Sequence, residues 1–448
     1  MQMKNKDMSV SEAENYLNQI PRFSKDKHSV DTVRQMLHIM GNPEGSTKFI
    51  HVAGTNGKGS VCAFLSSILL KAGYTTAVFT SPHLVSTKER FSFNGQDVDD
   101  ALFLESFYTI RDYSETFERE GLGHPSYFEY LFLMFMVMLK ERPCEFAVLE
   151  TGLGGRLDAT NALEHPALTV ITSISLDHME YLGSTVTQIA GEKAGIIKPG
   201  IPVVYDNTAL EASAVIEQRA KELKCSAYPV DSTSYKALSL QDGRLSLTGF
   251  SIESEAALSL DIPFAAEYQA VNAMLAVRTA EILGIKKDMI KTGIRTAYWP
   301  GRMEQIKQDV YLDGAHNEGG IREFSRAASE LVLKRGGGRK LLLFAVVSDK
   351  EYQDMAEILC REFGPDVLVL TQIDYSRGLD IGELDRAAHE AWEQVDAKVP
   401  HDIRVIPTVE AAFNEVLKEK KQEDTVFCAG SLYLIGEIKR LLRRNEDE

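Results

Sequence analysis

Short apolar segments alternate with helical periodicity along most of the chain, and this alternation constrains the fold more than any other feature of the sequence. Each segment has the length of a strand, ends in a loop, and precedes apolar residues spaced at helical intervals. Strands that alternate with helices predict βαβ units, which associate into a mainly parallel sheet covered by helices. In the first part of the chain the segments are 48–53, 75–80, 145–150, 167–172 and 201–205.

Two interruptions divide this alternation. Leucines alternate with other residues on both sides of Asp242-Gly243, which predicts an antiparallel hairpin within 236–262. Residues 298–302 are typical of a linker, because Pro and Gly end regular structure. We therefore predict an α/β protein with two domains. Residues 1–297 form the first, with a mainly parallel sheet and a small antiparallel appendage, and residues 298–448 form a smaller Rossmann-like domain. Its predicted strands are 310–312, 341–347, 367–370, 403–406 and 425–428.

Composition narrows the possible partners and the cell compartment. The 448 residues include 49 Lys and Arg against 65 Asp and Glu, a formal net charge of −16. We expect no nucleic-acid partner, because an acidic chain lacks a broad basic face. Five widely spaced cysteines without a CxxC pair favour a reduced, cytoplasmic protein. The N-terminal segment lacks the apolar region of a signal peptide, and the apolar run 131–139 predicts a buried helix, not a membrane span.

The strongest local signal is the segment His51–Ser60, where a predicted strand leads into a glycine-rich turn, a lysine and a helix. Glycines let backbone N–H groups point inward, the helix N-terminus favours an anion, and Lys58 can neutralise phosphate charge. The spacing departs from the common GxxxxGK[ST] form, because Gly59 separates Lys58 from Ser60. An ordinary tight turn is the alternative. The order of features favours a phosphate-binding loop formed by Gly54, Thr55, Asn56, Gly57, Lys58, Gly59 and Ser60.

Oxygen and imidazole groups that could hold Mg²⁺ follow other strands of the same predicted sheet. Glu150 ends one strand, Ser81 follows another, and His178 lies shortly after a third. Ligands gather at the carboxyl ends of parallel strands, so these groups and Ser60 could converge around Mg²⁺ and ATP. Taken singly, Glu150 could be a solvated strand end and His178 a structural histidine.

Four further residues carry weaker signals. Lys193, on a predicted helix after His178, would by itself be a surface lysine, and Asn272, on a predicted helix over 267–283, would be a surface or cap residue. Asp313 and His316 directly follow the first strand of the second domain. That position is typical of a site, although Asp-Gly alone is simply a turn.

Taken together, the motifs resemble a known family. The loop Gly54–Ser60 resembles the ATP-binding loop of the Mur ligase superfamily, and the full set is similar to the folylpolyglutamate synthase/dihydrofolate synthase family within it. The resemblance implies an ATP-dependent amide ligase that activates a folate or dihydropteroate carboxylate as an acyl phosphate, which L-glutamate then attacks. The motifs are His51–Val61, Ser81–Leu84 with Glu89-Arg90, Leu149–Asn161, Ser175–His178, Ile189–Pro199, Trp299–Glu304, Asp313–Asn317 and Gly430–Leu434.

The resemblance also implies roles for single residues. Ser81, Glu150 and His178 would hold magnesium, with Ser60 near the phosphates. Lys193 matches the family's carbamylated lysine, whose anion could bind a second Mg²⁺ or orient the acyl phosphate. Lys58 and His316 complete the expected catalytic set, His316 in the glutamate region.

Other residues would contact the nucleotide and the folate. By resemblance Asn272, Arg302 and Asp313 lie on ATP, and residues 81–95 match a mobile loop over the site. Family likeness also favours a monomer. The segment expected to contact the pterin is Leu157, Asp158 and Ala159, with Phe128 and Glu129 nearby.

One segment departs from the family pattern, and two rival functions are open. Residues 23–30 lack the glycines that many members carry there, which affects the expected pterin contact and the balance between the two folate activities. A cell-wall ligase would share the phosphate loop, but only 53 residues precede Gly54, too few for a separate UDP-binding domain. A nucleotide-dependent switch would not need Glu150, His178, Lys193 and Asp313 together.

Overall fold

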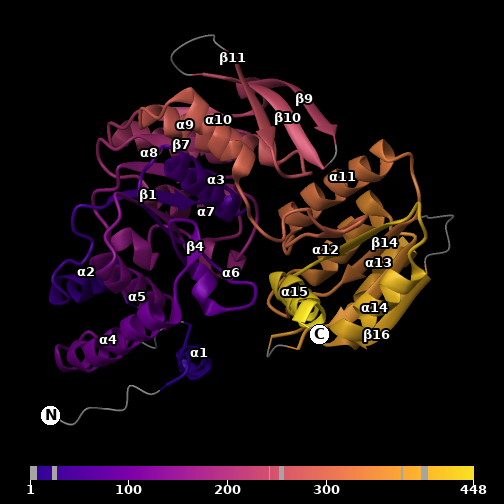
Figure 1. The fold of residues 1–448 in the computed structure, drawn as a ribbon, viewed down its shortest axis with the longest axis horizontal. Helices are drawn as coiled ribbons and strands as arrows, with labels where there is room; N and C mark the ends of the chain where they lie inside the picture. Colours follow the sequence, from indigo (N-terminus) through magenta and orange to yellow (C-terminus); the bar gives the residue numbers. More distant parts are fainter. Residues whose placement is uncertain are drawn as a thin grey trace.

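The computed structural model describes residues 8–22, 28–241, 243–251, 257–374, 377–394 and 402–447. Two sheet-containing regions lie side by side, and a third, smaller sheet lies above them in Figure 1. The predicted α/β architecture is therefore confirmed. The domain boundary predicted at residue 297 falls between α10 (Lys287–Thr296) and β12 (Glu304–Lys307) and stays a prediction.

The first sheet has eight strands in the order β4-β3-β2-β5-β1-β6-β7-β8. Six neighbouring strands of this sheet run parallel, and they include all five strands predicted from the sequence. In spatial order they are β2, β5, β1, β6, β7 and β8. The expectation of a loop over residues 81–95 is wrong for Phe91–Phe93, because these residues form β3, which pairs antiparallel with β2. The other strands are β1 (Lys48–Ala53), β2 (Thr76–Phe79), β4 (Gln96–Asp97), β5 (Phe146–Glu150), β6 (Leu168–Ile171), β7 (Val203–Asp206) and β8 (Ala227–Val230).

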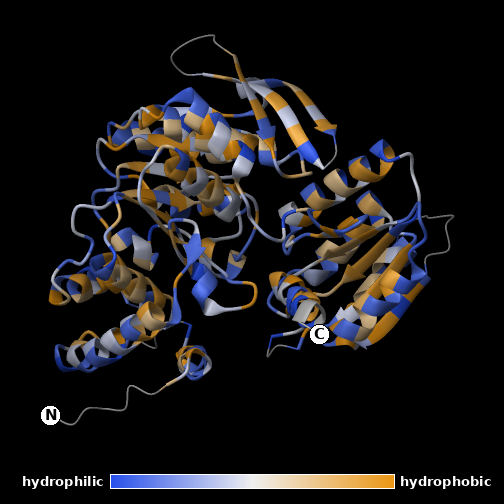
Figure 2. Ribbon diagram, in the orientation of Figure 1, coloured by the Kyte–Doolittle hydropathy of each residue, from blue (hydrophilic) through white to orange (hydrophobic). Residues whose placement is uncertain are grey.

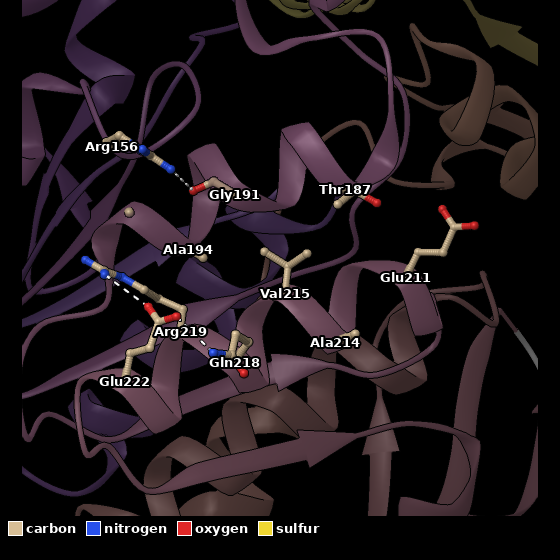
Figure 3. A pocket seen from close by; sticks show the side chains of 11 residues that line it. Arg156, Thr187, Gly191, Ala194, Glu211, Ala214, Val215, Gln218, Arg219 and Glu222 are labelled. Carbon is tan, nitrogen blue, oxygen red and sulfur yellow. Dashed lines mark hydrogen bonds and ion pairs between the residues drawn. The ribbon is translucent and has the colours of Figure 1, made fainter.

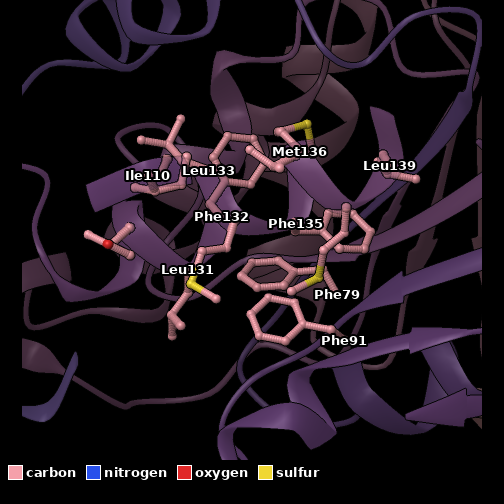
Figure 4. Packing of buried hydrophobic residues seen from close by; sticks show 14 of the residues in the cluster. Phe79, Phe91, Ile110, Leu131, Phe132, Leu133, Phe135, Met136 and Leu139 are labelled. Atoms are coloured by element: carbon pink, nitrogen blue, oxygen red, sulfur yellow. The ribbon is translucent and has the colours of Figure 1, made fainter. Parts of the chain in front are cut away.

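Helices cover both faces of this sheet. On one face lie α3 (Lys58–Lys71), α9 (Gln269–Ile282) and α10. The buried helix predicted over 131–139 is confirmed as α5 (Tyr127–Glu141), which packs on the other face (Figure 4). Phe79 and Phe135 stack there with ring centroids 5.4 Å apart. The other helices on that face are α1 (Val10–Gln19), α2 (Val30–Ile39), α4 (Asp100–Arg119), α7 (Val186–Lys193) and α8 (Leu210–Glu222).

The predicted antiparallel appendage has three strands, β9 (Tyr235–Gln241), β10 (Arg244–Phe250) and β11 (Ala257–Ile262). Of the predicted turn, Asp242 lies outside the described residues. Leu245, Leu247, Leu258 and Leu260 face inward and join the apolar cluster of α3 and α9. The alternation of leucines therefore reports one buried face, as period-two patterning predicts.

The second sheet has the order β12-β13-β17-β14-β15-β16, parallel except for β12. The four strands between β12 and β16 are apolar and buried, and the helices present polar outer faces (Figure 2). This agrees with the predicted Rossmann-like domain. The strands beside β12 are β13 (Val310–Leu312), β14 (Lys340–Phe344), β15 (Val367–Gln372), β16 (Asp402–Thr408) and β17 (Thr425–Ala429). The helices are α11 (Glu318–Lys334), α12 (Tyr352–Ile358), α13 (Ile381–Gln394), α14 (Val409–Glu419) and α15 (Leu432–Asp447).

The loop after β2 joins the two sheet domains. Leu84 is 8% exposed and belongs to the apolar cluster formed by Leu312, Leu434 and Ile438 of the second domain. A Cβ atom on Gly436 of α15 would lie 2.0 Å from the Leu84 carbonyl oxygen, so only glycine permits this approach. Among the described residues no helix is long and apolar enough to cross a membrane.

Candidate active site

The predicted phosphate-binding loop connects β1 to α3 and is held by the end of β6. The Thr55 N–H group donates to the Ser173 carbonyl at 2.8 Å, and Thr172 Oγ1 donates to the Asn56 carbonyl at 2.6 Å. Gly57 has φ +88°, a conformation that L side chains rarely adopt, immediately before the helix begins. The local sequence therefore determines both the turn and the start of the helix.

Two lysines meet at this loop. Lys58 Nζ donates to the carbonyls of Gly54 at 3.1 Å and Thr55 at 3.0 Å, and Lys193 Nζ donates to the Gly54 carbonyl at 2.7 Å. Lys193 is buried, and burial together with the Lys58 charge lowers its pKa to about 7. A lysine with this pKa has a substantial neutral fraction at physiological pH, which makes its amine a nucleophile.

Helix α9 supports the first turn of α3. Gln269 Nε2 donates to the Ser60 hydroxyl at 3.1 Å, and Asn272 Nδ2 donates to Gln269 Oε1 at 3.1 Å. A Cβ atom on Gly57 would lie 2.4 Å from Asn272 Oδ1, so the Asn272 amide lies against the loop. The Trp299 ring covers Gly59 in the same way, because a Cβ atom on Gly59 would lie 2.6 Å from it. The structure thus places Asn272 beside the loop and adds Gln269, and the expected contact of Asn272 with ATP stays a prediction.

Glu150 and Ser81 meet at the carboxyl ends of β5 and β2. Glu150 Oε2 accepts the Ser81 N–H group at 3.0 Å, and Glu150 is 3% exposed. Burial raises its pKa, and the charges of Lys58, Arg302 and Arg90 oppose that rise. Among the described residues the Ser81 N–H group is the one hydrogen-bond donor to this carboxylate, so its remaining oxygen lone pairs can accept a divalent cation.

His178 begins the short helix α6 (Met179–Leu182) with φ +51°. Burial lowers its pKa to about 4, so its imidazole is neutral and able to bind a metal. The His178 imidazole has Asp177 as its acidic neighbour, with His178 Nε2 3.9 Å from Asp177 Oδ1. Among the described residues no hydrogen bond or ion pair joins His178 to Glu150. The described residues form no cluster of three or more His, Cys, Asp or Glu suited to a metal. Mg²⁺ needs no such cluster, because phosphate oxygens and water complete its shell.

The second domain contributes Asp313 and His316 at the end of β13. The buried Asp313 carboxylate accepts from the N–H groups of Met303 and Ala315, each at 2.9 Å, and from the Tyr268 hydroxyl at 3.0 Å. His316 donates from Nδ1 to the Gly314 carbonyl at 2.7 Å, which leaves Nε2 as the acceptor. Burial, followed by the Lys350 charge, lowers the pKa of His316 to about 4. A Cβ atom on Gly314 would lie 2.4 Å from Arg302 Nη1, so Arg302 lies beside this turn.

A polar network between the domains was not expected from the sequence. Asn56 and Asn317 exchange two amide hydrogen bonds of 3.1 Å, which join the phosphate loop to the second domain. Asn317 Nδ2 also donates to Asp177 Oδ2 at 2.8 Å, and Lys350 Nζ donates to Asp177 Oδ1 at 2.7 Å. Lys350 follows β14, so the rule that ligands gather at the carboxyl ends of strands could have found it.

The predicted pterin-contacting residues have differing surroundings. The Asp158 carboxylate accepts from the Gly152 and Leu153 N–H groups at 2.8 and 2.9 Å, so it stabilises its own loop. Glu129 forms the capping box of α5 with Ser126. Leu157 is 56% exposed, Ala159 is buried, and Phe128 lies against Gly152.

A cavity of about 700 Å³ lies outside this site, between α7 and α8 (Figure 3). Thr187 and Gly191 of α7 line it four residues apart, and Gly195 of the following 3-10 turn (Ala194–Ile196) continues this lining. Lys193 leaves the helix on another face toward Gly54. None of the described lining residues belongs to the predicted catalytic, ATP-binding, metal-binding or substrate-binding set.

Comparisons with known proteins agree with this arrangement. The "Mur ligase middle domain" family model matches residues 52–280, and the "Mur ligase, glutamate ligase domain" model matches residues 301–432. The dihydrofolate synthase/folylpolyglutamate synthase of Bacillus subtilis is 34% identical, over 93% of this chain and 95% of its own length. The chain belongs to the folylpolyglutamate synthase/dihydrofolate synthase family. The predicted family and ligase class are thereby confirmed.

Solved structures of family members share the whole fold. The Mycobacterium tuberculosis folylpolyglutamate synthase complexed with ADP has a TM-score of 0.85 and 26% identity, and covers 98% of this chain and 99% of its own. The E. coli FolC in complex with DHPP and ADP has a TM-score of 0.84 and 25% identity, covering 99% and 100%. The roles of single residues in this member stay predictions.

Proposed function

We propose that this protein, an ATP-dependent ligase by its family, joins L-glutamate to reduced folates and to dihydropteroate. The observation that carries this proposal is the convergence of Lys58 and Lys193 on the Gly54 carbonyl, inside the same domain as the buried Glu150–Ser81 pair. A nucleotide-binding switch would need the loop but not a second buried lysine or a buried carboxylate.

The reaction forms one amide. A carboxylate oxygen of the folate attacks the γ-phosphorus of ATP, ADP leaves, and the product is an acyl phosphate. The glutamate nitrogen then attacks the acyl carbon, phosphate leaves, and the nitrogen loses its proton. Lys58 offsets the charge of the transferring phosphoryl group. His316 orients the amine, because its Nδ1 donates to Gly314 and its Nε2 can only accept.

Residues of both domains would hold ATP. The N–H groups of Gly57, Gly59 and Ser60 would bind the phosphates at the start of α3, with Asn272 beside them. Gly54, Thr55 and Asn56 shape the loop, because the Thr55 and Asn56 N–H groups donate to the Ser173 carbonyl. Arg302 and Asp313 approach from the second domain, and the hydrogen bond of the buried Asp313 carboxylate with the half-buried Tyr268 supports a contact with the nucleoside.

The donor set fits Mg²⁺ at two sites. Ser60, Ser81, Glu150 and His178 offer hydroxyl, carboxylate and neutral imidazole groups. When bound, Mg²⁺ supplies charge neutralisation at the phosphates. Lys193 is the carbamylated residue: its neutral amine adds to CO₂ and releases a proton, and the carbamate anion then serves the second site.

The folate would lie beside loop 151–160. Phe128 and Leu157 offer apolar surface, Asp158 and Ala159 shape the loop, and Glu129 holds the start of α5. Residues 23–27, where the family glycines are missing, lie outside the described residues. We further propose a cytoplasmic monomer that binds neither nucleic acid nor membrane, in keeping with the acidic composition and five free cysteines.

A side-by-side assay tests the proposed function. The purified protein, ATP, Mg²⁺ and L-glutamate are combined with dihydropteroate or tetrahydrofolate, and ADP and products are resolved by mass. We expect ADP and an amide in equal amounts, with no ADP when the folate is omitted. ADP formation without an amide product would favour the nucleotide switch, and amide formation only with a muramyl peptide would favour a cell-wall ligase.

A further inference from the structure

The side chain of His51 joins the strand that carries the phosphate loop to the loop proposed to lie beside the folate. His51 belongs to β1, three residues before Gly54, and is 1% exposed. Side chains alternate along a strand, so His51 lies on the same face as Phe49, which joins the apolar cluster of α5. On that face its Nε2 lies 2.8 Å from Thr160 Oγ1. A polar ring inside an apolar layer therefore has Thr160 as a hydrogen-bond partner.

Thr160 extends this contact to Asp158. The Thr160 hydroxyl and N–H groups both donate to Asp158 Oδ1, the N–H group at 3.1 Å, and Asp158 caps the short 3-10 helix Ala159–Ala162. The other carboxylate oxygen, Oδ2, accepts the Gly152 and Leu153 N–H groups at 2.8 and 2.9 Å. A carboxylate offers about four lone-pair positions, so donors of its own loop are enough to saturate Asp158.

The direction of each hydrogen bond follows from the groups involved. An ionised carboxylate only accepts, so the Thr160 hydroxyl gives its one proton to Asp158. The Thr160 oxygen is then an acceptor, and His51 supplies the proton from Nε2. Burial, followed by the Lys198 charge, lowers the pKa of His51 to about 3, so its imidazole is neutral. The side chains of His51, Thr160 and Asp158 form an ordered hydrogen-bond relay.

This relay sets the shape of the loop over residues 151–160. Asp158 holds the Gly152 N–H group just after β5, and a Cβ atom on Gly152 would lie 2.6 Å from the Phe128 ring. Leu157, next to Asp158 in the chain, is 56% exposed. The two apolar side chains that we assign to the folate, Phe128 and Leu157, therefore lie against or beside residues that the relay holds in place.

We propose that His51 is a positioning residue for the folate substrate, which acts through Thr160 and Asp158 on the loop over residues 151–160. The inference rests on the proposed function and adds His51 and Thr160 to the residues that determine folate binding. Because His51 lies in the strand that enters the phosphate loop, the relay also fixes the folate loop relative to that strand. A small displacement of such a loop weakens substrate binding without removing any group that contacts ATP.

Two substitutions of His51 test the relay with nearly equal demands on folding. In His51→Gln the side-chain amide nitrogen can reach the position of Nε2 and still donate to Thr160, whereas the shorter amide of His51→Asn cannot. Thr160→Val and Thr160→Ser form a second pair, which removes or keeps the hydroxyl. The control is Thr169→Val: Thr169 is buried on β6, pairs with His51 in the sheet register, and donates to the Pro202 carbonyl at 3.2 Å.

The measurements are the KM values for the folate substrate and for ATP in the full chain, with thermal unfolding in parallel. For His51→Asn and Thr160→Val we expect a roughly tenfold higher folate KM, the effect of losing one hydrogen bond in a network that includes a charged group. The KM for ATP should be unchanged. His51→Gln and Thr160→Ser should recover most of the loss, and Thr169→Val should leave both KM values unchanged.

The double variant His51→Asn/Thr160→Val should be no worse than the weaker of its two single variants, because both act through one relay. Equal folate KM values for His51→Asn and His51→Gln would overturn the inference, as would equal increases in the KM for folate and for ATP. If the wild type formed no amide from dihydropteroate or tetrahydrofolate, the proposed function would fail instead.

Discussion

The ion pair between Lys350 and Asp177 crosses the domain interface, and its removal should be costly. The side chains are 8% and 11% exposed, and the atoms are 2.7 Å apart. At an effective dielectric constant of about 20 the attraction is about 6 kcal/mol, part of which desolvation offsets. In Lys350→Met the buried Asp177 carboxylate keeps two hydrogen-bond donors, the Asn317 side-chain amide and the backbone N–H group of His178. We expect a loss of roughly 3 kcal/mol in the free energy of unfolding.

The pair is best measured by a double-mutant cycle. Urea unfolding of Lys350→Met, Asp177→Asn and the double variant gives the coupling energy, which should exceed about 1.5 kcal/mol. The exposed pair Arg361–Glu357, with atoms 2.9 Å apart on one helix, is the matched control and should couple by about 0.3–0.5 kcal/mol. A coupling energy for the interdomain pair no larger than that of the control would refute the reasoning.

The pH dependence of this pair has a definite sign. Burial alone would raise the pKa of Asp177, but the charge of Lys350 and its hydrogen bond hold that pKa well below its ordinary value. The pair therefore stabilises the fold at all pH values above the pKa of an unfolded aspartate. That stability is lost only as the pH falls toward the lower folded pKa. Between about pH 6 and pH 8 the coupling energy should stay constant, because His178 and His316, which lie near Asp177, are neutral there.

Four further outcomes are expected. Lys58→Ala should reduce amide formation roughly 10³-fold in a steady-state assay, because phosphate charge is no longer offset, and near-normal turnover would exclude this role. Lys193→Ala should be inactive and regain part of its activity with short carboxylic acids at high concentration; full activity of the plain variant would remove Lys193 from the mechanism. At limiting CO₂, the activity of the wild type should decrease as the pH falls below 7. The reason is that Lys193, with a pKa of about 7, becomes protonated, and only its neutral amine reacts with CO₂. Gly59→Ala should lower the free energy of unfolding by about 1–3 kcal/mol in a thermal unfolding experiment, because the added Cβ would lie 2.6 Å from Trp299. The control Gly191→Ala should cost nothing, because its Cβ meets only the tip of the flexible Arg156 side chain at 3.8 Å. Equal effects of the two glycine substitutions would contradict this packing.

Local patterns predicted the parts of the site that local structure determines. The loop from Gly54 to Ser60 follows from one strand, one turn and one helix start, all contiguous in the sequence. The edge strands were harder to find. The strands β3 and β4 have three and two residues, too few for a periodic signal, and β8 is half-exposed. Glu129 was expected near the pterin, although Ser126 three residues earlier is the signature of the capping box that it forms.

Contacts between the domains could not be predicted from periodicity. Asn56 and Asn317 are 261 residues apart and Asp177 and Lys350 are 173 apart. Hydrophobic patterning specifies which face of each element is buried, but carries no information on how two finished sheets meet.

Leu84 has a consequence for how the chain can be divided. The predicted boundary near residue 297 separates two stretches of sequence, yet the apolar interior of the second stretch includes a side chain from the first. A fragment beginning at residue 298 would therefore fold around an unfilled hole next to Leu434 and Ile438. Such a fragment should gain stability when a synthetic peptide spanning Ser81 to Arg90 is added, so the two halves should behave as complementing pieces of one protein.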